Sequence, residues 1–365
     1  MKIGRKHYRT IWVHPDDPTV IQVIDQRMLP HEFHIRDLRH PHDFVHAIKD
    51  MVVRGAPLIG ITAAYGLYSA LLHSHAGNAQ QNLQAAYEQL LTTRPTASNL
   101  KWALKKQMLA IAEGKNLGEK VRIALEHANQ MAEEDIEACK KIGRHGLKII
   151  EQISMRKNGE PVHILTHCNA GWLATVDYGT ATAPIYMAHD KGIKVHVWVS
   201  ETRPRNQGSS LTAYELLEQG VPHTVVVDNA CGHLMQRGWV DLCLVGSDRT
   251  TSAGDVCNKI GTYLKALAAY ENKIPFYAAV PSSSIDWEIT DMTQIPIEER
   301  SETEVKHIQG FDGKRIVSVL LTPSHSKALN YGFDVTPARF ITGLITERGI
   351  CKPGRKELSM LFFDT

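Results

Sequence analysis

The chain has 365 residues, 43% of them apolar and 22% charged, which excludes a disordered chain and is typical of a globular protein long enough for two domains. Its 41 basic and 39 acidic residues are interspersed and leave a formal net charge of +2, which argues against nucleic acid or an anionic membrane as a partner. The six cysteines lack paired spacing, no secretory leader follows the basic N-terminus, and no apolar run reaches the length of a membrane span, so we expect free thiols and a cytoplasmic protein.

Residues 1–145 are predicted to form a mainly helical N-terminal domain with short β-strands. Runs of β-branched residues indicate strands at 10–13 and 20–25. Apolar residues with helical spacing predict helices at 41–53, 58–73, 79–92, 97–113 and 118–155. The last of these is long, and we expect a break within it.

Residues 146–365 are predicted to form a Rossmann-like domain with a parallel sheet. Short apolar runs predict strands at 162–166, 194–199, 223–228, 242–245 and 276–280. Stretches with helical spacing lie between them at 175–191, 210–219, 230–237 and 258–270. This alternation predicts right-handed crossovers, so the fold class is α/β. No glycine-rich dinucleotide fingerprint or P-loop is present, so neither kind of nucleotide site is supported.

The polar stretch from Gly246 to Thr262 is the strongest candidate for a site. It follows an apolar run, 240–245, that predicts a buried strand, and ligands bind at the carboxyl ends of parallel strands. Its two aspartates compete with plainer roles in helix capping and ion pairing. Asp255 precedes the next predicted helix by a few residues, which favours capping, whereas Asp248 lies nearer the strand end and is the better candidate for acid chemistry.

Cys168 follows the first strand of the predicted sheet, in the segment 166–171. Most free cysteines are simply small buried side chains, but a strand end beside a helix N-terminus is where a thiol becomes reactive. His163 and His167 lie close by in sequence, yet without further paired ligands they make a poor zinc pattern. We therefore expect a functional thiol here and no metal.

Two arginines lie between predicted helices of the N-terminal domain. Arg54 precedes a glycine and a proline that alone account for a helix stop and restart, and Arg94 precedes another proline. A lone arginine is usually a solvated surface residue, but two together are able to clamp a phosphate through forked hydrogen bonds. A further polar loop at 201–208 follows the second strand of the predicted sheet, which favours one shared site.

In combination, these motifs resemble those of the methylthioribose-1-phosphate isomerase family, and the similarity runs in order from about residue 20 to about residue 350. The motifs that carry it are Arg-Gly-Ala-Pro at 54–57, Arg-Pro-Thr-Ala at 94–97, Thr-His-Cys-Asn-Ala-Gly at 166–171, Glu-Thr-Arg-Pro at 201–204, Asp-Asn at 228–229, Gly-Asp-Val-Cys-Asn-Lys-Ile-Gly-Thr at 254–262, Val-Thr-Pro at 335–337 and Ile-Thr-Glu-Arg-Gly at 345–349. The wider superfamily also includes non-catalytic regulatory subunits of a translation-initiation exchange factor.

The resemblance implies an aldose-ketose isomerase of methionine salvage, with a sugar phosphate as substrate, no cofactor, no metal and a homodimeric assembly. It implies that Cys168 and Asp248 are catalytic and that the substrate is contacted by Arg54, Gly55, Ala56, Arg94, Gln207, Asn258 and Lys259. A phosphate on C1 prevents opening to a free aldehyde, so Asp248 would protonate the ring oxygen. Hydrogen then moves from C2 to C1, by proton transfer or hydride shift, with Cys168 as base or as polar stabiliser.

The chain departs from the family pattern at several positions, none of which removes a catalytic group. The departures are Trp172, Asp177, Tyr178, Cys231, Ser247, Thr250 and Ala253. They leave open a relative that acts on another C5-modified ribose 1-phosphate, such as 5-deoxyribose 1-phosphate. The alternative of a different class is a sugar-phosphate-sensing regulatory protein on the same fold, which would not need an acid and a thiol facing the sugar.

Overall fold

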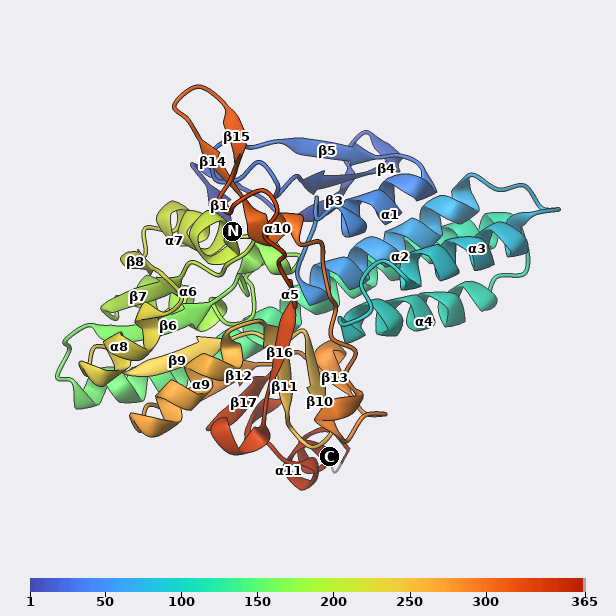
Figure 1. Ribbon diagram of the computed structural model, residues 1–365. Coiled ribbons are helices and arrows are strands. Elements are labelled where there is room, and N and C mark those ends of the chain that lie inside the picture. Colours follow the sequence, from blue (N-terminus) through green and yellow to red (C-terminus); the bar gives the residue numbers. More distant parts are fainter. Residues whose placement is uncertain (364–365) are drawn as a thin grey trace.

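The computed structural model describes residues 1–363 and consists of a helical part followed by an α/β sandwich (Figure 1). The first part begins with short strands: β1 (Lys2–Ile3), β2 (Lys6–His7), β3 (Ile11–His14), β4 (Asp17–Ile24) and β5 (Ile35–Leu38). Strands β3, β4 and β5 form an antiparallel sheet, of which the sequence predicted only the first two strands. The helices that follow are α1 (Pro41–Lys49), α2 (Ala56–Leu72), α3 (Ala79–Leu91), α4 (Ser98–Ala112) and α5 (Leu117–Arg156).

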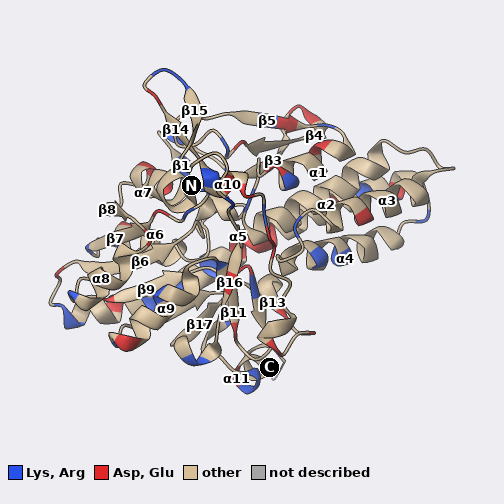
Figure 2. Ribbon diagram, viewed as in Figure 1, with Lys and Arg blue, Asp and Glu red and all other residues tan. Residues whose placement is uncertain are grey.

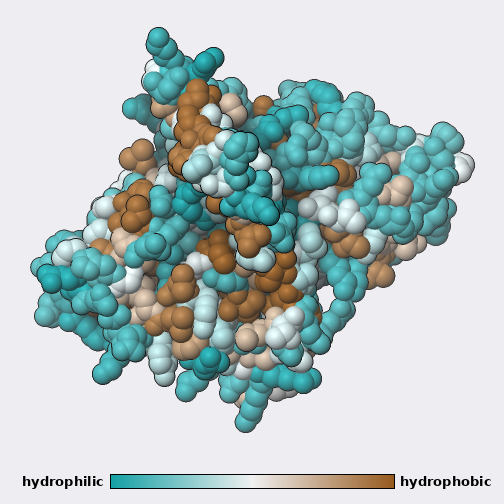
Figure 3. All heavy atoms as spheres, viewed as in Figure 1, coloured by the Kyte–Doolittle hydropathy of each residue, from teal (hydrophilic) through white to brown (hydrophobic). Residues whose placement is uncertain are grey.

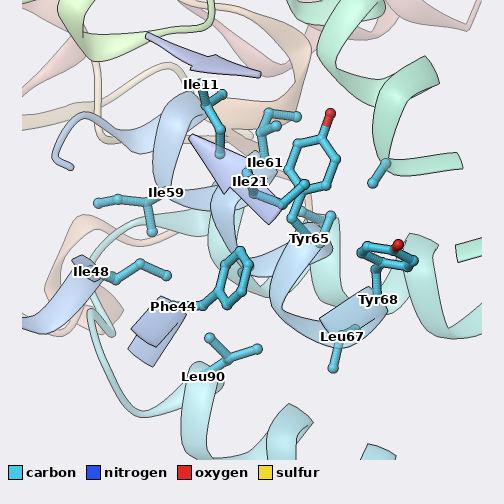
Figure 4. Packing of buried hydrophobic residues seen from close by; sticks show 14 of the residues in the cluster. Ile11, Ile21, Phe44, Ile48, Ile59, Ile61, Tyr65, Leu67, Tyr68 and Leu90 are labelled. Atoms are coloured by element: carbon cyan, nitrogen blue, oxygen red, sulfur yellow. The ribbon is translucent and has the colours of Figure 1, made fainter. Parts of the chain in front are cut away.

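Helix α2 is the centre of the first hydrophobic core. It is apolar on every side because it is surrounded by α1, α3, α4 and α5, and its residues from Ala56 to Leu71 are all buried. Phe44, Ile59, Leu67 and Leu90 belong to this cluster, and Figure 4 shows their side chains together with neighbouring ones. The packing fixes where α2 begins, and its N-terminus borders the candidate site described below.

Helix α5 contains no break. It runs for 40 residues from Leu117 to Arg156, and its first turn is capped by the side chain of Asn116, which accepts a 2.9 Å hydrogen bond from the Glu119 amide. The expected interruption is therefore wrong. Residue 145 lies inside this continuous helix, which packs on α2 and α4 with its first half and on α6 of the second part with its second half. The division into domains at 145/146 stays a prediction.

The predicted α/β class is confirmed by a seven-stranded sheet. Its spatial order is β18-β17-β12-β9-β6-β7-β8, and all neighbours are parallel except β17 and β18. The strands are β6 (Val162–His167), β7 (Val195–Ser200), β8 (His223–Val226), β9 (Leu242–Val245), β12 (Phe276–Ala279), β17 (Gly343–Thr346) and β18 (Gly349–Cys351). The chain starts at β6, moves outward to β8, and returns to β9 on the other side of β6. The direction of winding therefore reverses between β6 and β9, as in doubly wound nucleotide-binding folds.

Helices cover both faces of this sheet. They are α6 (Ala183–Asp190), α7 (Ala213–Glu218), α8 (Ala230–Gln236), α9 (Thr262–Glu271) and α11 (Arg355–Phe362). Apolar residues of α5, α6 and α7 form one core with the sheet, and those of α8, α9 and α11 form another. The inner strands β6, β9, β12 and β17 are thus largely buried on both faces, which explains their apolar runs, whereas the edge strands β8 and β18 are partly exposed.

Two predicted helices of this part begin later than expected. The stretch 175–191 is helical only from Ala183, because the residues before it fold back and donate amides of Thr180 and Ala181 to the Ala170 carbonyl. The stretch 258–270 is helical only from Thr262, because Gly261 takes a left-handed φ of +97° that ends the preceding strand.

The polar stretch 246–262 is a β-hairpin and not an irregular loop. It contributes β10 (Arg249–Thr251) and β11 (Val256–Lys259) to a second sheet with the order β13-β10-β11-β16. The outer strands of that sheet are β13 (Ile285–Asp286) and β16 (Phe333–Thr336). Asn258 and Lys259 are therefore strand residues, where the sequence predicted a helix, and the pairing with β16 fixes their orientation.

A second hairpin projects from the body of the molecule (Figure 1). It follows the short helix α10 (Thr303–Lys306) and consists of β14 (His307–Phe311) and β15 (Ile316–Leu320). Phe311, Val319 and Leu320 on it are each about half exposed, and Figure 3 shows an apolar strip where the hairpin lies. Basic and acidic residues are interspersed over the elements in Figure 2. Within residues 1–363, no helix is both long and apolar enough to cross a membrane.

Candidate active site

Cys168 and Asp248 lie at the point where the sheet reverses its winding. Strands β6 and β9 are hydrogen-bonded neighbours, with Leu165 opposite Cys243. Cys168 directly follows β6, and Asp248 comes three residues after the end of β9. The chain crosses to one face of the sheet after β6 and to the other face after β9, so a crevice forms between the carboxyl ends of the two strands. Both residues line one small cavity in this crevice.

The cavity gathers most of the residues that the resemblance assigned to the site. Its walls come from the N-terminus of α2, the segment after β6, and the β10–β11 hairpin. Its lining includes Arg54, Gly55, Ala56, Pro57, Cys168, Asn169, Ala170, Thr180, Ser247, Asp248, Asn258 and Pro281. Segments more than 200 residues apart in the sequence thus form a single wall, so the two parts of the molecule build this cavity together.

The backbone of Cys168 is held in an unusual conformation. Its φ is +63°, in the left-handed region that few residues other than glycine adopt. The amide of Cys168 donates to the Thr202 hydroxyl at 2.8 Å, and its carbonyl accepts from the Thr212 hydroxyl at 2.7 Å. These bonds stabilise the strained turn and direct the thiol toward the cavity that it lines.

The segment around Thr202 is organised by Asp228. The carboxylate of Asp228 accepts the backbone amides of Thr202 at 2.9 Å and Arg203 at 2.7 Å. It also accepts the Ser200 hydroxyl and lies 3.8 Å from the Lys265 ammonium. Asp228, in the motif at 228–229, therefore acts on Cys168 indirectly, through Thr202.

His167 is fully buried beside this carboxylate and is not placed as a metal ligand. Burial lowers the pKa of the ring to about 3, with the Lys265 ammonium adding to the effect and Asp228 opposing it. Its Nε2 lies 2.8 Å from the Ile260 carbonyl and its Nδ1 3.1 Å from the Ser200 hydroxyl. Both nitrogens thus have partners, and across residues 1–363 no three His, Cys, Asp or Glu side chains group as a metal site requires.

The surroundings of Asp248 favour the protonated form of its carboxyl group. Its amide donates to the Cys257 carbonyl at 2.9 Å and its carbonyl accepts from the Ser98 amide at 3.4 Å, which fixes the backbone. Burial raises the pKa of the carboxyl above its usual value, and the charges of Lys259, Arg54 and Arg94 oppose this without cancelling it. A carboxylic acid that keeps its proton beside a sugar is able to donate it.

Asn258 lines the cavity from strand β11, whereas its neighbour Lys259 is buried close by and is not part of the lining. Burial lowers the pKa of the Lys259 ammonium, while Cys168 and Asp248 act to raise it. The ammonium lies 4.3 Å from the centre of the Phe333 ring, and the described residues place no carboxylate within 4.0 Å of it. A buried cation of this kind is available to a ligand anion. The side-chain amide of Asn258 donates to the Thr262 hydroxyl at 3.1 Å.

Arg54 is engaged by Asn169 in this structure. Its two terminal nitrogens donate to the side chain and the backbone carbonyl of Asn169, the latter at 2.7 Å. Asn169 in turn donates to Glu215 at 2.9 Å, and Glu215 also accepts the amides of Trp172 and Leu173. Glu215 is completely buried and holds the whole segment after β6 in place. Nothing in the sequence distinguishes Glu215, because one carboxylate in an amphipathic stretch carries no characteristic pattern.

Gln207 lines a neighbouring, larger cleft, and Arg54 is common to both spaces. The wall of this cleft includes Leu29, Met51 and Leu211 together with polar residues of α10 and the β14–β15 hairpin. The side-chain amide oxygen of Gln207, Oε1, is buried without a hydrogen-bond partner among the described residues. The structure thus places Gln207 next to the cavity of Cys168 and Asp248, and not within its lining.

Arg94 lines neither space but is buried close to the site. Its Nε donates to Glu298 at 3.0 Å, and its Nη1 has no partner among the described residues. The loop that carries it is held by Arg249, which donates to the carbonyls of Pro95 and Thr96 and pairs with Asp286 at 2.8 Å. Arg249 is thus a structural residue, and Glu298 is a second carboxylate near the site that the sequence did not reveal.

Asp255 does not cap the helix that follows it. Its carboxylate accepts the Ala338 amide at 2.9 Å and the Thr251 hydroxyl at 3.2 Å. The first turn of α9 is capped instead by Asp334, which accepts the amides of Gly261 at 2.7 Å and Tyr263 at 3.1 Å. The predicted capping role was wrong because strand β11 separates Asp255 from α9.

Of the departures from the family pattern, only Ser247 lines the cavity. Its hydroxyl lies 2.8 Å from that of Thr250. Trp172 is fully buried in the core between the sheet and α5, and Cys231 packs beneath the opposite face. Asp177 binds the N-terminal amine at 2.5 Å. These three residues therefore act on the core and the N-terminus and do not shape the cavity wall directly.

Gly55 is required by a close approach of two backbones, so Gly55→Ala is expected to be strongly destabilising. An alanine Cβ at this position would lie well under 3.0 Å from backbone atoms of Ala174, and φ is +101°. We expect the free energy of unfolding to fall by roughly 2–5 kcal/mol, from overpacking and backbone strain together. Urea unfolding measures the change. Gly159→Ala is the control, because Gly159 has a φ of +81° but open space around it. An equal loss in the two variants would contradict the argument from packing.

Comparisons with known proteins identify the family of the chain. Residues 52–353 match the initiation factor 2 subunit family. The methylthioribose-1-phosphate isomerase from Desulfatibacillum aliphaticivorans is 54% identical to the chain, over 100% of the chain and 99% of the relative. The one from Brucella anthropi is 56% identical, over 99% of the chain and 99% of the relative. The crystal structure of 5-methylthioribose 1-phosphate isomerase from Pyrococcus horikoshii OT3 superimposes with a TM-score of 0.83 at 38% identity, covering 99% of this chain and 97% of that one.

A translation initiation factor eIF-2B subunit delta from A. fulgidus is also similar, with a TM-score of 0.78 at 35% identity over 97% of this chain and 99% of that chain. The identity to the isomerases is higher and extends over the full length of both proteins. The resemblance seen in the sequence motifs is thereby confirmed: the chain belongs to the methylthioribose-1-phosphate isomerase family of isomerases, within the initiation factor 2 subunit family.

Proposed function

We propose that the chain converts 5-methylthioribose 1-phosphate into 5-methylthioribulose 1-phosphate, within methionine salvage. The observation that carries the proposal is that Cys168 and Asp248, on neighbouring strands, line one cavity next to the N-terminus of α2. An acid, a thiol and several cations are what this isomerisation needs. The identity of the named relatives supports the choice of substrate.

The phosphate is held by the cationic side of the site. Arg94 is buried with an unused Nη1 donor, Lys259 is a buried cation, and the first amides of α2 carry no side-chain cap. A helix N-terminus and buried cations attract an anion through the same partial and full charges. Arg54 joins them when the ligand competes with Asn169 for its guanidinium. Gln207, on the side of the larger cleft, contacts the sugar from the other direction.

In the chemical step, Asp248 gives its proton to the ring oxygen as the bond between C1 and that oxygen breaks. The hydrogen on C2 then moves to C1, and the C2 hydroxyl becomes a carbonyl by losing its own proton. Cys168 assists either by removing the C2 hydrogen as a proton, through an enol between C1 and C2, or by stabilising a hydride shift. The proton from the C2 hydroxyl restores the acid, so the reaction needs no external reductant or oxidant.

A phosphorus NMR time course tests the proposal. The purified protein is incubated with methylthioribose 1-phosphate, and separately with 5-deoxyribose 1-phosphate. We expect the signal of the anomeric phosphate to be replaced by that of a primary phosphate ester, faster with the methylthio sugar. Faster conversion of the deoxy sugar would assign the other C5-modified substrate. Binding of both sugars without conversion would support a sugar-phosphate sensor, as the similarity to an initiation-factor subunit also allows.

The pH dependence is expected to reveal the protonated acid. Because burial raises the pKa of Asp248, turnover is present below the raised pKa and is lost as the pH rises through it. We expect kcat to fall on the alkaline side, with a midpoint above the ordinary carboxyl value of 3.8. Saturating substrate is used, so that titration of the free phosphate near pH 6 does not contribute. A kcat that rises through pH 4–5 and then stays level would instead indicate a carboxylate base.

The homodimer expected from the family stays a prediction. Light scattering of the full chain measures its mass against the 40.8 kDa of one copy.

A further inference from the structure

Residues 295–306 form a segment that connects the two sides of the site. We call it the strap. At one end, the Glu298 amide donates to the Thr96 hydroxyl at 3.2 Å, and that hydroxyl donates to the Pro296 carbonyl at 2.8 Å. At the other end, Arg203 donates to the Val305 carbonyl at 2.7 Å. The strap thus joins the loop of Arg94, from the helical part, to the loop after β7.

A line of ion pairs runs along the strap. Glu298 binds Arg94 through one carboxylate oxygen, at 3.0 Å, and Arg300 through the other, at 2.5 Å. Arg300 also pairs with Glu304 at 2.7 Å, and Glu304 pairs with Arg205 at 3.0 Å. The side chains of Arg94 and Glu298 are only 7% and 12% exposed. Burial makes such pairs demanding in geometry, because each charge depends on its partner for the solvation it has lost.

The ion pair with Glu298 leaves part of the Arg94 guanidinium free for a ligand. Glu298 binds Nε, while Nη1 is buried and without a partner among the described residues. A buried donor with no acceptor costs free energy, and a native site keeps one where a ligand completes the bond. The charge of Arg94 also acts on Asp248, which places the guanidinium within electrostatic range of the candidate acid.

We propose that Glu298 is a positioning residue, which orients Arg94 through Nε so that its free Nη1 donates to the phosphate of the substrate. This inference rests on the proposed function, because it assumes a sugar phosphate in the site. Both oxygens of Glu298 are needed, one for each arginine. A glutamine offers only one acceptor, and its NH2 group faces a second cation that it cannot bind.

A double-mutant cycle tests whether Glu298 acts through Arg94. The variants Glu298→Gln, Arg94→Ala and the pair of both are assayed for KM and kcat with methylthioribose 1-phosphate, and for the Kd of inorganic phosphate by calorimetry. We expect Glu298→Gln to raise KM and the phosphate Kd roughly tenfold, the effect of weakening one charge-assisted hydrogen bond, with a smaller change in kcat. In the Arg94→Ala background the same substitution is expected to change KM less than twofold, because the group it positions is gone.

Glu299→Gln is the matched control, since Glu299 is the exposed neighbour of Glu298 and forms no ion pair with the described residues. Its KM is expected to equal that of the parent. Glu298→Asp retains the charge but cannot span both arginines, so it is expected to raise KM even if the glutamine variant folds poorly. Thermal melting of each variant shows whether the fold is retained.

The pH dependence of kcat distinguishes a positioning role of Glu298 from a merely structural one, which would leave that dependence unchanged. The Glu298 charge contributes to raising the pKa of Asp248, so its removal is expected to shift the alkaline limb of kcat to lower pH. An unchanged KM in Glu298→Gln would overturn the inference. It would also be overturned if the KM of the double variant showed the product of the two single effects, because Glu298 and Arg94 would then act independently. If the parent binds phosphate but isomerises neither sugar, the proposed function fails, while a tenfold weaker phosphate Kd in Glu298→Gln still supports the positioning role.

Discussion

Asp248→Asn is expected to abolish most turnover while leaving substrate binding nearly intact. The asparagine has almost the same volume and cannot deliver a proton to the ring oxygen, so kcat is expected to fall by about 10²–10⁴-fold, the usual contribution of a general acid. The backbone of Asp248 is bonded to Cys257 and Ser98 and does not depend on the carboxyl, so the fold is expected to survive. Stopped assays with phosphorus NMR give kcat, and calorimetry gives Kd for the substrate.

The control for this variant is Asp255→Asn in the same hairpin. Asp255 binds the Ala338 amide and faces away from the cavity lining, and asparagine keeps an acceptor for that amide. Its kcat is expected to stay within a few-fold of the parent. If Asp248→Asn retains more than about a tenth of the parental kcat, then Asp248 is not the acid, and the raised pKa of its carboxyl reflects burial alone.

Cys168→Ser is expected to have the second large effect. Serine fits the left-handed turn as well as cysteine and keeps the bonds of the backbone to Thr202 and Thr212. Its hydroxyl, however, is a far weaker acid than a thiol and is not ionised to any useful degree. We expect kcat to fall by roughly 10²–10⁴-fold with Kd for the substrate little changed.

Cys351→Ser, on the edge strand β18, is the control and is expected to retain the parental kcat. Running the parental reaction in D2O separates the two roles of Cys168. Deuterium at C1 of the product would show proton transfer, with the thiolate as base, whereas its absence would favour a hydride shift. Full activity in Cys168→Ser would rule out both roles and leave Asp248 with another partner.

The sequence predicted those parts of the site that depend on neighbouring residues in the chain. The strands that precede Cys168 and Asp248 are buried on both faces, so each appears as a mainly apolar run followed by polar residues. Because parallel strands place their carboxyl ends at one edge, that pattern alone predicted a shared site there. The assignment of the contacting residues came from the resemblance to the family and not from spacing.

Long-range pairing produced the errors. Asn258 and Lys259 precede a helix and share its apolar spacing, yet β16, more than 70 residues further along, pairs with them and makes them strand residues. Asp334, in that same strand, takes the capping role that was predicted for Asp255. No local pattern at either position encodes a partner so distant in sequence.

By itself, the sequence determined the α/β class, the helices around α2, the strands β6 and β9, and the family, because each depends on local periodicity or on contiguous motifs. Only the tertiary structure decided which charges meet. Glu215 beneath Asn169, Asp228 behind Thr202 and Glu298 beside Arg94 are single carboxylates in ordinary stretches. Their significance comes from burial and from partners between 26 and 204 residues away, which are fixed when the two parts of the chain pack around the cavity.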